Sequence, residues 1–329
     1  MIFWVEFAVA TALLVLMANK LAEYADIISI RTRLGGAFVG TILMAGATSL
    51  PEFLTTINSL DRNVPNLAAG NMFGSCMFNM FLLAILDLSF WRARVLRRVA
   101  LRHALTAGLA ITLIAMASLL IMADIDLQIG WVGVDSLLLI GAYLAGIRLL
   151  QAENPRLPEP EEIPAGEEMM SLSRALVGFV AAAAALVVIT PALVGSAVGI
   201  AEQTGLGTGF VGAALVGMAT SLPEMVTMYA AARLGAYDLA VGNLFGSNLF
   251  NMFALAATDL IYLEGRFLGD IDPVFAIAGL ISLLLTSLGL INNLARMERR
   301  ILFVETDALL LMIIHIAGLY LLYARGIAG

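Results

Sequence analysis

The sequence is poor in charged residues, histidine and cysteine. Only 13% of its 329 residues are charged and 61% are hydrophobic, whereas a soluble domain has about 25% charged residues. Water therefore cannot be the main solvent of this chain. The single cysteine, Cys76, excludes an intrachain disulfide, and two histidines are too few for a zinc site of the Cys/His type. Any metal ion that the protein binds must be held by oxygen atoms.

Large basic clusters are also missing. The 18 lysines and arginines are outnumbered by 25 acidic residues, which gives a net charge of −7. This balance excludes nucleic acid as a partner and leaves the lipid bilayer as the surrounding that the composition favours. No segment indicates an obligatory protein partner.

What the sequence does have is apolar runs of membrane-crossing length. A helix needs about 20 apolar residues to cross a hydrocarbon core of about 30 Å, and ten such runs are present, with no segment that indicates a strand. We predict an all-α integral membrane protein with ten transmembrane helices. The predicted helices are residues 3–22, 34–60, 65–88, 104–123, 127–150, 173–201, 205–233, 238–261, 271–293 and 305–324.

A proline- and glutamate-rich segment separates the fifth predicted helix from the sixth. Residues 151–170 contain four prolines and six glutamates, a composition that resists burial and helix continuation. We predict two five-helix halves, residues 1–150 and 173–329, joined by an acidic linker at 151–172.

The positive charges predict an orientation. If the N-terminus is outside, fifteen of the eighteen lysines and arginines fall in loops on the cytoplasmic side, as the positive-inside rule requires. We therefore expect a multi-pass protein of the cell membrane with its N-terminus outside and its linker in the cytoplasm.

One segment of the sequence occurs twice. Residues 47–88 and 219–260 align without a gap at an offset of 172, with 22 identities in 42 positions. Five predicted helices separate equivalent positions, and an odd number reverses the direction of the second copy across the membrane. The sequence thus predicts two inverted repeats, an arrangement typical of transporters.

Each repeat contains one carboxylate deep in an apolar run. Glu52 is the only charged residue in 34–60, and Glu224 is the only one in 205–232. An acidic residue at the centre of a membrane helix costs roughly 2.5–3.5 kcal/mol, so it is normally kept for a function. Inverted repeats bring equivalent positions together near the bilayer midplane, and a cation between the two carboxylates would offset their repulsion.

The neighbours of both glutamates supply further oxygen atoms. Pro51 and Pro223 precede them, and a proline inside a helix frees a backbone carbonyl one turn earlier. Hydroxyl side chains stand in the same turn, and carbonyl, hydroxyl and carboxylate oxygens are ligands that calcium and sodium accept. A second polar stripe, at i, i+4 and i+8, follows in each repeat. The turn residues are Thr48, Ser49, Thr220 and Ser221, and the stripes are Asn71, Ser75 and Asn79, and Asn243, Ser247 and Asn251.

These paired motifs, ATSLPE with GNMFGSCMFN and ATSLPE with GNLFGSNLFN, resemble the alpha-repeats of the sodium/calcium exchangers, within the cation/calcium antiporter superfamily. The resemblance implies that Glu52, Glu224 and the carbonyls of Thr48 and Thr220 bind calcium. It also implies two sodium-binding groups with amides near the centre. Those groups are Ala45, Thr48, Ser75 and Ser221 on one side and Gly217, Thr220, Ser247 and Ser49 on the other, with Asn79 and Asn251 central. Some prokaryotic relatives have an aspartate at one of the central amide positions, whereas this chain has asparagine at both.

The expected function is a secondary active antiporter that exchanges sodium for calcium by alternating access, with calcium and sodium as transported ions and no cofactor. Coupling to protons or potassium, and a passive cation channel, are the alternatives that the same residues leave open. An intramembrane enzyme that uses the two carboxylates as an acid–base pair is a third, but the Thr, Ser and Asn side chains around them favour ion binding, so we expect no enzymatic activity.

Overall fold

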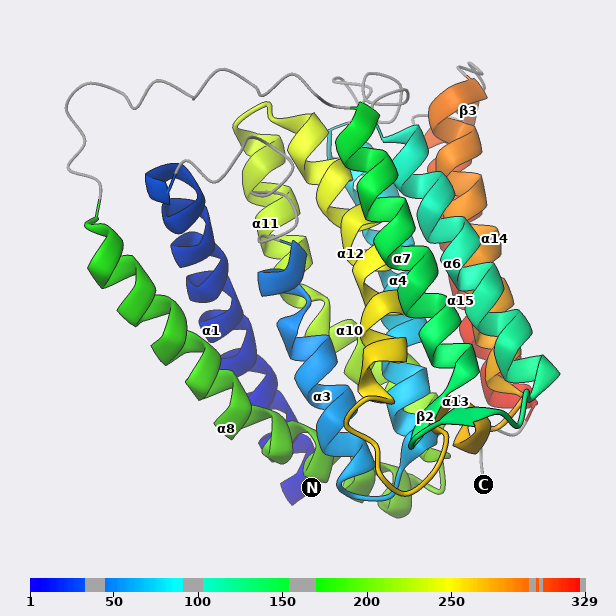
Figure 1. The fold of residues 1–329 in the computed structure, drawn as a ribbon. Helices are drawn as coiled ribbons and strands as arrows, with labels where there is room; N and C mark the ends of the chain where they lie inside the picture. Colours follow the sequence, from blue (N-terminus) through cyan, green and yellow to red (C-terminus); the bar gives the residue numbers. More distant parts are fainter. Residues whose placement is uncertain (33–44, 91–102, 154–169, 296–299, 302–303, 326–329) are drawn as a thin grey trace.

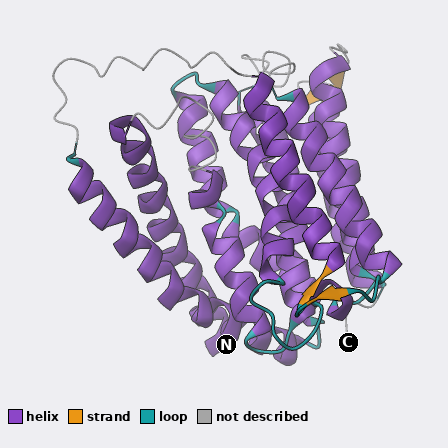
Figure 2. Cartoon of the chain, in the orientation of Figure 1, coloured by secondary structure: helices purple, strands orange, loops and turns teal. Residues whose placement is uncertain are grey.

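The computed structural model describes residues 1–32, 45–90, 103–153, 170–295, 300–301 and 304–325. Long helices side by side make up nearly all of the described chain (Figures 1 and 2). Its first half contains α1 (Ile2–Thr32), α3 (Leu50–Leu60), α4 (Pro65–Ser89), α6 (Ala104–Ala123), β1 (Gln128–Ile129), β2 (Val132–Gly133) and α7 (Val134–Glu153). Its second half contains α8 (Leu172–Thr204), α9 (Thr208–Val211), η1 (Gly212–Val216), α10 (Gly217–Thr220), α11 (Leu222–Arg233), α12 (Tyr237–Thr258), α13 (Phe267–Asp270), α14 (Phe275–Ala295), β3 (Arg300–Ile301), β4 (Val304–Glu305) and α15 (Thr306–Ala324).

The helices confirm a multi-pass membrane fold. Within the described residues, eight helical runs are long and apolar enough to cross a bilayer, α9 to α11 counting as one. The apolar helix α14 is a further, shorter candidate. The predicted helix 34–60 is described only from residue 45, and most of the predicted linker 151–172 lies outside the described residues, so the count of ten stays a prediction.

Three details of the helix prediction were wrong. The expected helix 127–150 begins only at Val134, because residues 128–133 form the antiparallel hairpin β1–β2, with Gly130 at φ +71° in its turn. The expectation of no strands fails there and at β3–β4. The expected helix 205–233 is not continuous, because a π-helical turn, η1, and a break at Ser221 interrupt it.

The helices differ in how much of their surface faces outward. α4 and α12 are central, since 78% of the residues in the apolar stretch of each helix are buried. In α1 and α8, only 22% and 28% of these residues are buried. α1 and α8 lie side by side at one edge of the bundle and pack chiefly against each other (Figure 1). Their outward side chains are large and apolar, Val188 being 77% exposed, which is the surface that a lipid environment requires.

Glycines bring the second half of the bundle against α4. A Cβ atom added to Gly70 would lie 2.9 Å from the backbone nitrogen of Ala213 in η1. A Cβ atom on Gly217 would lie 2.8 Å from the backbone nitrogen of Ser75. Small residues of this kind let membrane helices approach at backbone distance, and here they place α10 directly beside the polar stripe of α4.

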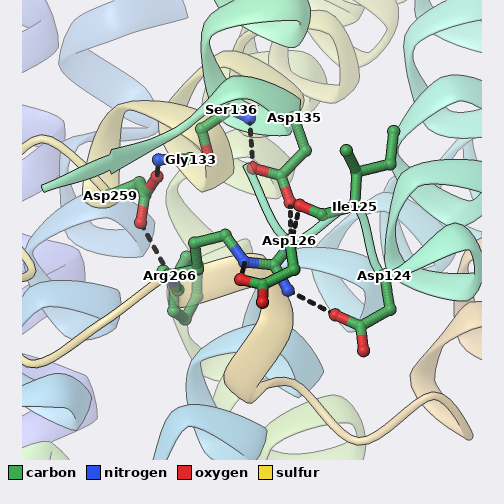
Figure 3. A network of polar contacts seen from close by, with 9 residues as sticks. Asp124, Ile125, Asp126, Gly133, Asp135, Ser136, Asp259 and Arg266 are labelled. Carbon is green, nitrogen blue, oxygen red and sulfur yellow. Dashed lines mark hydrogen bonds and ion pairs between the residues drawn. The ribbon is translucent and has the colours of Figure 1, made fainter. Parts of the chain in front are cut away.

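A buried arginine joins loops at the end of the bundle where the chain begins (Figures 1 and 3). Arg266 donates a hydrogen bond to Asp124, and a second, of 3.0 Å, to Asp135. Asp259 accepts hydrogen bonds of 2.7 Å from the backbone nitrogens of Gly133 and Phe267. The network ties the α6–α7 hairpin to the C-terminal end of α12.

The electrostatic balance at Arg266 favours its charged form. Burial lowers the pKa of the guanidinium, but the hydrogen bond to Asp124 and the charges of Asp135, Asp124 and Asp126 outweigh this effect, so its pKa is raised. The side chain of Arg266 is only 9% exposed and that of Asp135 is 1% exposed. A charge buried to this degree depends on its partner.

We therefore predict that Arg266→Met lowers the free energy of unfolding by about 3–5 kcal/mol, because it leaves the buried carboxylate of Asp135 without a countercharge. The matched control is Asp126→Asn, because Asp126 is 93% exposed and 3.8 Å from Arg266 and should matter by less than about 1 kcal/mol. Unfolding of the purified protein in mixed micelles measures both. Equal effects of the two variants would contradict the prediction.

Candidate cation site

Both glutamates of the repeat lie at helix starts in the middle of the molecule. Glu52 is in the first turn of α3, and Glu224 is in the first turn of α11. Each helix follows a break at a serine whose backbone is outside the α-helical region, with φ −92°, ψ 6° at Ser49 and φ −88°, ψ 4° at Ser221. The disrupted turn that Pro51 and Pro223 predict is thus present in both halves, since each proline stands at the start of the following helix.

The two halves exchange hydrogen bonds across this centre. The hydroxyl of Ser49 donates to Oε1 of Glu224 at 3.2 Å, and the hydroxyl of Ser221 donates to Oε1 of Glu52, also at 3.2 Å. Each serine therefore holds the carboxylate of the opposite half, and the equivalent positions meet as the inverted repeat predicts.

The remaining predicted residues surround this pair, although not in equal ways. Ser247 donates to Oε1 of Glu224 at 3.2 Å. Ser75, its equivalent, instead lies 3.2 Å from the carbonyl of Gly217 and 3.3 Å from the hydroxyl of Thr220. Among the described residues, Glu224 thus accepts hydrogen bonds from two hydroxyl groups and Glu52 from one.

In each half, a threonine hydroxyl lies close to a backbone carbonyl just before the helix break. The hydroxyl of Thr48 donates to the carbonyl of Ala45 at 3.2 Å, and Thr220 lies 3.4 Å from the carbonyl of Gly217. All twelve predicted site residues are buried. They are Ala45, Thr48, Ser49, Glu52, Ser75, Asn79, Gly217, Thr220, Ser221, Glu224, Ser247 and Asn251.

Four buried side-chain oxygen atoms of the predicted site residues have no hydrogen-bond partner among the described residues. They are Oε2 of Glu52, Oε2 of Glu224, Oδ1 of Asn79 and Oδ1 of Asn251. Among the described residues, no lysine, arginine or histidine forms an ion pair with either glutamate. Buried acceptors of this kind are costly unless they are paired. A bound cation would offset this cost, and carboxylate with amide oxygens is a donor set suited to calcium or sodium.

Two buried amides have roles that the sequence alone does not predict. Asn71 bonds the backbone carbonyl of Glu52 at 3.0 Å and accepts from Thr220 at 3.0 Å, so it connects the two halves. Asn248 accepts a hydrogen bond of 2.9 Å from Asn79. The polar stripe predicts a buried Asn71, but Asn248 lies outside the stripe, and its only signal is that the first repeat has Cys76 at the same position.

A bundle of apolar helices around two buried carboxylates, neither of which forms an ion pair within the described chain, is typical of an integral membrane protein that handles cations. The sequence profile described as "Sodium/calcium exchanger protein" matches residues 2–150 and 174–325. The chain therefore belongs to the sodium/calcium exchanger family, whose members are membrane antiporters rather than enzymes.

Individual relatives agree with this membership. The chain is 25% identical over 327 residues to a protein named as an antiporter, CaxA of Alkalimonas amylolytica, covering 96% of this chain and 97% of that protein. It is 39% identical over 72 residues to the sodium/calcium exchanger MaX1 of Methanosarcina acetivorans, covering 22% of this chain and 21% of that protein.

Solved structures have the same fold. Native YfkE superimposes with a TM-score of 0.67 at 18% identity, over 97% of this chain and 91% of that chain. The sodium–calcium exchanger NCX_Mj, soaked with Na⁺ and Sr²⁺, superimposes with a TM-score of 0.59 at 20% identity, over 97% and 98% of the two chains.

Proposed function

We propose that this protein exchanges sodium for calcium across a cell membrane, at a site centred on Glu52 and Glu224. The reciprocal hydrogen bonds of Ser49 and Ser221 carry the proposal, because they hold two unpaired carboxylates around one centre. A bound cation stabilises a buried pair of negative charges, and a divalent ion neutralises the pair fully. The stretch that is 39% identical to the sodium/calcium exchanger MaX1 supports sodium as the counter-ion.

The proposed architecture is ten transmembrane helices in two inverted five-helix repeats, residues 1–150 and 173–329. The described chain begins and ends at the same end of the bundle (Figure 1), as an even number of crossings requires. Arg266 lies at that end (Figure 3), and it is one of the three lysines and arginines that the predicted topology does not place in cytoplasmic loops. An end of the bundle with so few positive charges is expected to face outward, which supports an outside N-terminus and a cytoplasmic linker.

The proposed mechanism is alternating access. Two carboxylates balance one Ca²⁺, whereas three Na⁺, the number that the family resemblance implies, leave the loaded site with one positive charge. Exchange would then move net charge, and each charge moved through the membrane potential is worth about 2.3 kcal/mol per 100 mV. Sodium entry would in this way help to drive calcium out.

Calcium uptake into vesicles tests this proposal. Purified protein in sodium-loaded liposomes should take up calcium only while the outward sodium gradient exists, and a potassium-selective ionophore that sets an inside-positive potential should increase uptake. Uptake that survives collapse of the sodium gradient would overturn sodium coupling. Replacing the sodium gradient with a proton or potassium gradient identifies another coupling ion, and calcium conductance without any counter-ion identifies a channel.

A further inference from the structure

The orientation of two central amides decides what they present to an ion. Asn79 on α4 and Asn251 on α12 are fully buried, and the Oδ1 atom of each has no hydrogen-bond partner within the part of the chain that the structure describes. A side-chain amide has a carbonyl oxygen that attracts a cation and an NH₂ group that repels one. What holds the NH₂ group away therefore determines whether the amide serves as a ligand.

The amide of Asn79 is held by Asn248. Nδ2 of Asn79 donates to Oδ1 of Asn248 at 2.9 Å. Asn248 is itself fixed, because its Nδ2 lies 3.3 Å from the carbonyl of Cys76 and 3.3 Å from the hydroxyl of Thr286 on α14. With its nitrogen engaged by two acceptors, Asn248 must present its oxygen to Asn79, which leaves Oδ1 of Asn79 for a cation.

The amide of Asn251 is held by the equivalent residue of the other repeat, but weakly. Nδ2 of Asn251 donates to Sγ of Cys76 at 4.0 Å. Residues 76 and 248 occupy the same position of the two repeats, so each half holds the central amide of the opposite half. A thiol sulfur is a weak acceptor, and this contact is much longer than the oxygen contact of Asn248. The two amides are therefore held with unequal strength.

We propose that Cys76 and Asn248, here called the orienting positions, set the cation affinity of the central site by holding the amides of Asn251 and Asn79. Cys76 keeps this affinity below the value that a second asparagine would give. The inference rests on the proposed function, because it assumes that Asn79 and Asn251 present their oxygens to a transported cation. Neither orienting residue needs to touch that cation.

Calorimetric titration of the full chain in detergent, with calcium alone and with sodium alone, tests the role of Asn248. Asn248→Ala should weaken calcium binding by about tenfold or more, which is the usual effect of losing a residue that orients a metal ligand. Because Asn248 acts through Asn79, the double variant with Asn79→Ala should bind no more weakly than Asn79→Ala alone. The matched control is Thr286→Val, which removes one partner of Asn248 but leaves its oxygen facing Asn79, and it should change affinity by less than about twofold.

The opposite change tests Cys76. Cys76→Asn gives both halves the same orienting residue and should tighten calcium binding by about threefold, the low end of the effect of one hydrogen bond. A purely structural role would change the unfolding midpoint of the ion-free protein without raising affinity. This variant also decides the question if Asn248→Ala fails to fold.

Three results would overturn the inference. They are an unchanged affinity in Asn248→Ala, an equal loss in Thr286→Val, and an affinity in Cys76→Asn no higher than that of the natural chain. If the natural chain binds calcium and Glu52→Gln does not, these results leave the proposed function intact. Absence of both calcium and sodium binding in the natural chain would instead overturn the two together.

Discussion

Glu52→Gln is expected to abolish calcium binding while leaving the protein folded. The substitution keeps the shape of the side chain and an oxygen that can accept from Ser221, but it removes one of the two negative charges. Two unit charges 4 Å apart attract by about 4 kcal/mol at an effective dielectric constant of 20, and the divalent ion doubles this value. The affinity should therefore fall by more than about a thousandfold.

Thermal unfolding separates this loss from misfolding. Calcium should raise the midpoint of the natural chain, because a ligand that binds only the folded state stabilises it, and should have no effect on Glu52→Gln. Without ions, the variant should be at least as stable as the natural chain, since it no longer buries two carboxylates side by side. Glu224→Gln should behave alike.

The same substitution at an exposed glutamate is the control. Glu202 lies on the exposed surface near the end of α8, and Glu202→Gln should bind calcium like the natural chain. Unchanged affinity in either Glu52→Gln or Glu224→Gln would end the assignment of the site to this pair.

The burial of the two glutamates and the breaks before them could be predicted because they depend on local features of the sequence. A charge alone in an apolar run is visible without a structure, and so is the effect of Pro51 or Pro223 on the turn before it. The gapless repeat also predicts that the two carboxylates meet. Which serine holds which carboxylate could not be predicted, because the exchange between Ser49 and Glu224 depends on how the halves pack.

The errors in the predicted fold also arise where the structure depends on contacts between distant residues or on backbone conformation. Residues 128–133 continue an apolar run, so composition alone favours one long helix, and only Gly130 at positive φ indicates the turn of the hairpin. The role of Arg266 was hidden because its partners Asp124 and Asp135 are more than 130 positions away in the sequence. The unequal orienting positions, Cys76 and Asn248, were visible as a difference between repeats, but their contacts required the packed helices.

A further large effect is expected at a glycine of the α4 seam. In Gly74→Ala, the new Cβ atom would overlap the backbone of Ala213, lying 2.8 Å from its carbonyl carbon. Backbone cannot move aside as a side chain can, so we expect a loss of about 3 kcal/mol in the free energy of unfolding, the upper end of the usual cost of overpacking. Calcium binding should weaken as well, because pushing η1 and α10 from α4 separates Ser75 from Thr220, which now lie 3.3 Å apart. Unfolding in mixed micelles and calorimetric titration measure the two effects.

A glycine on the exposed face of α7, Gly141, gives a matched control with the opposite expectation. Among the described residues, a Cβ atom on Gly141 would meet nothing within 4 Å. Gly141→Ala should therefore fold and bind calcium like the natural chain, because the new methyl group displaces no packed atom. A natural unfolding midpoint in Gly74→Ala, or an equal loss of stability in both variants, would contradict the close seam between α4 and η1.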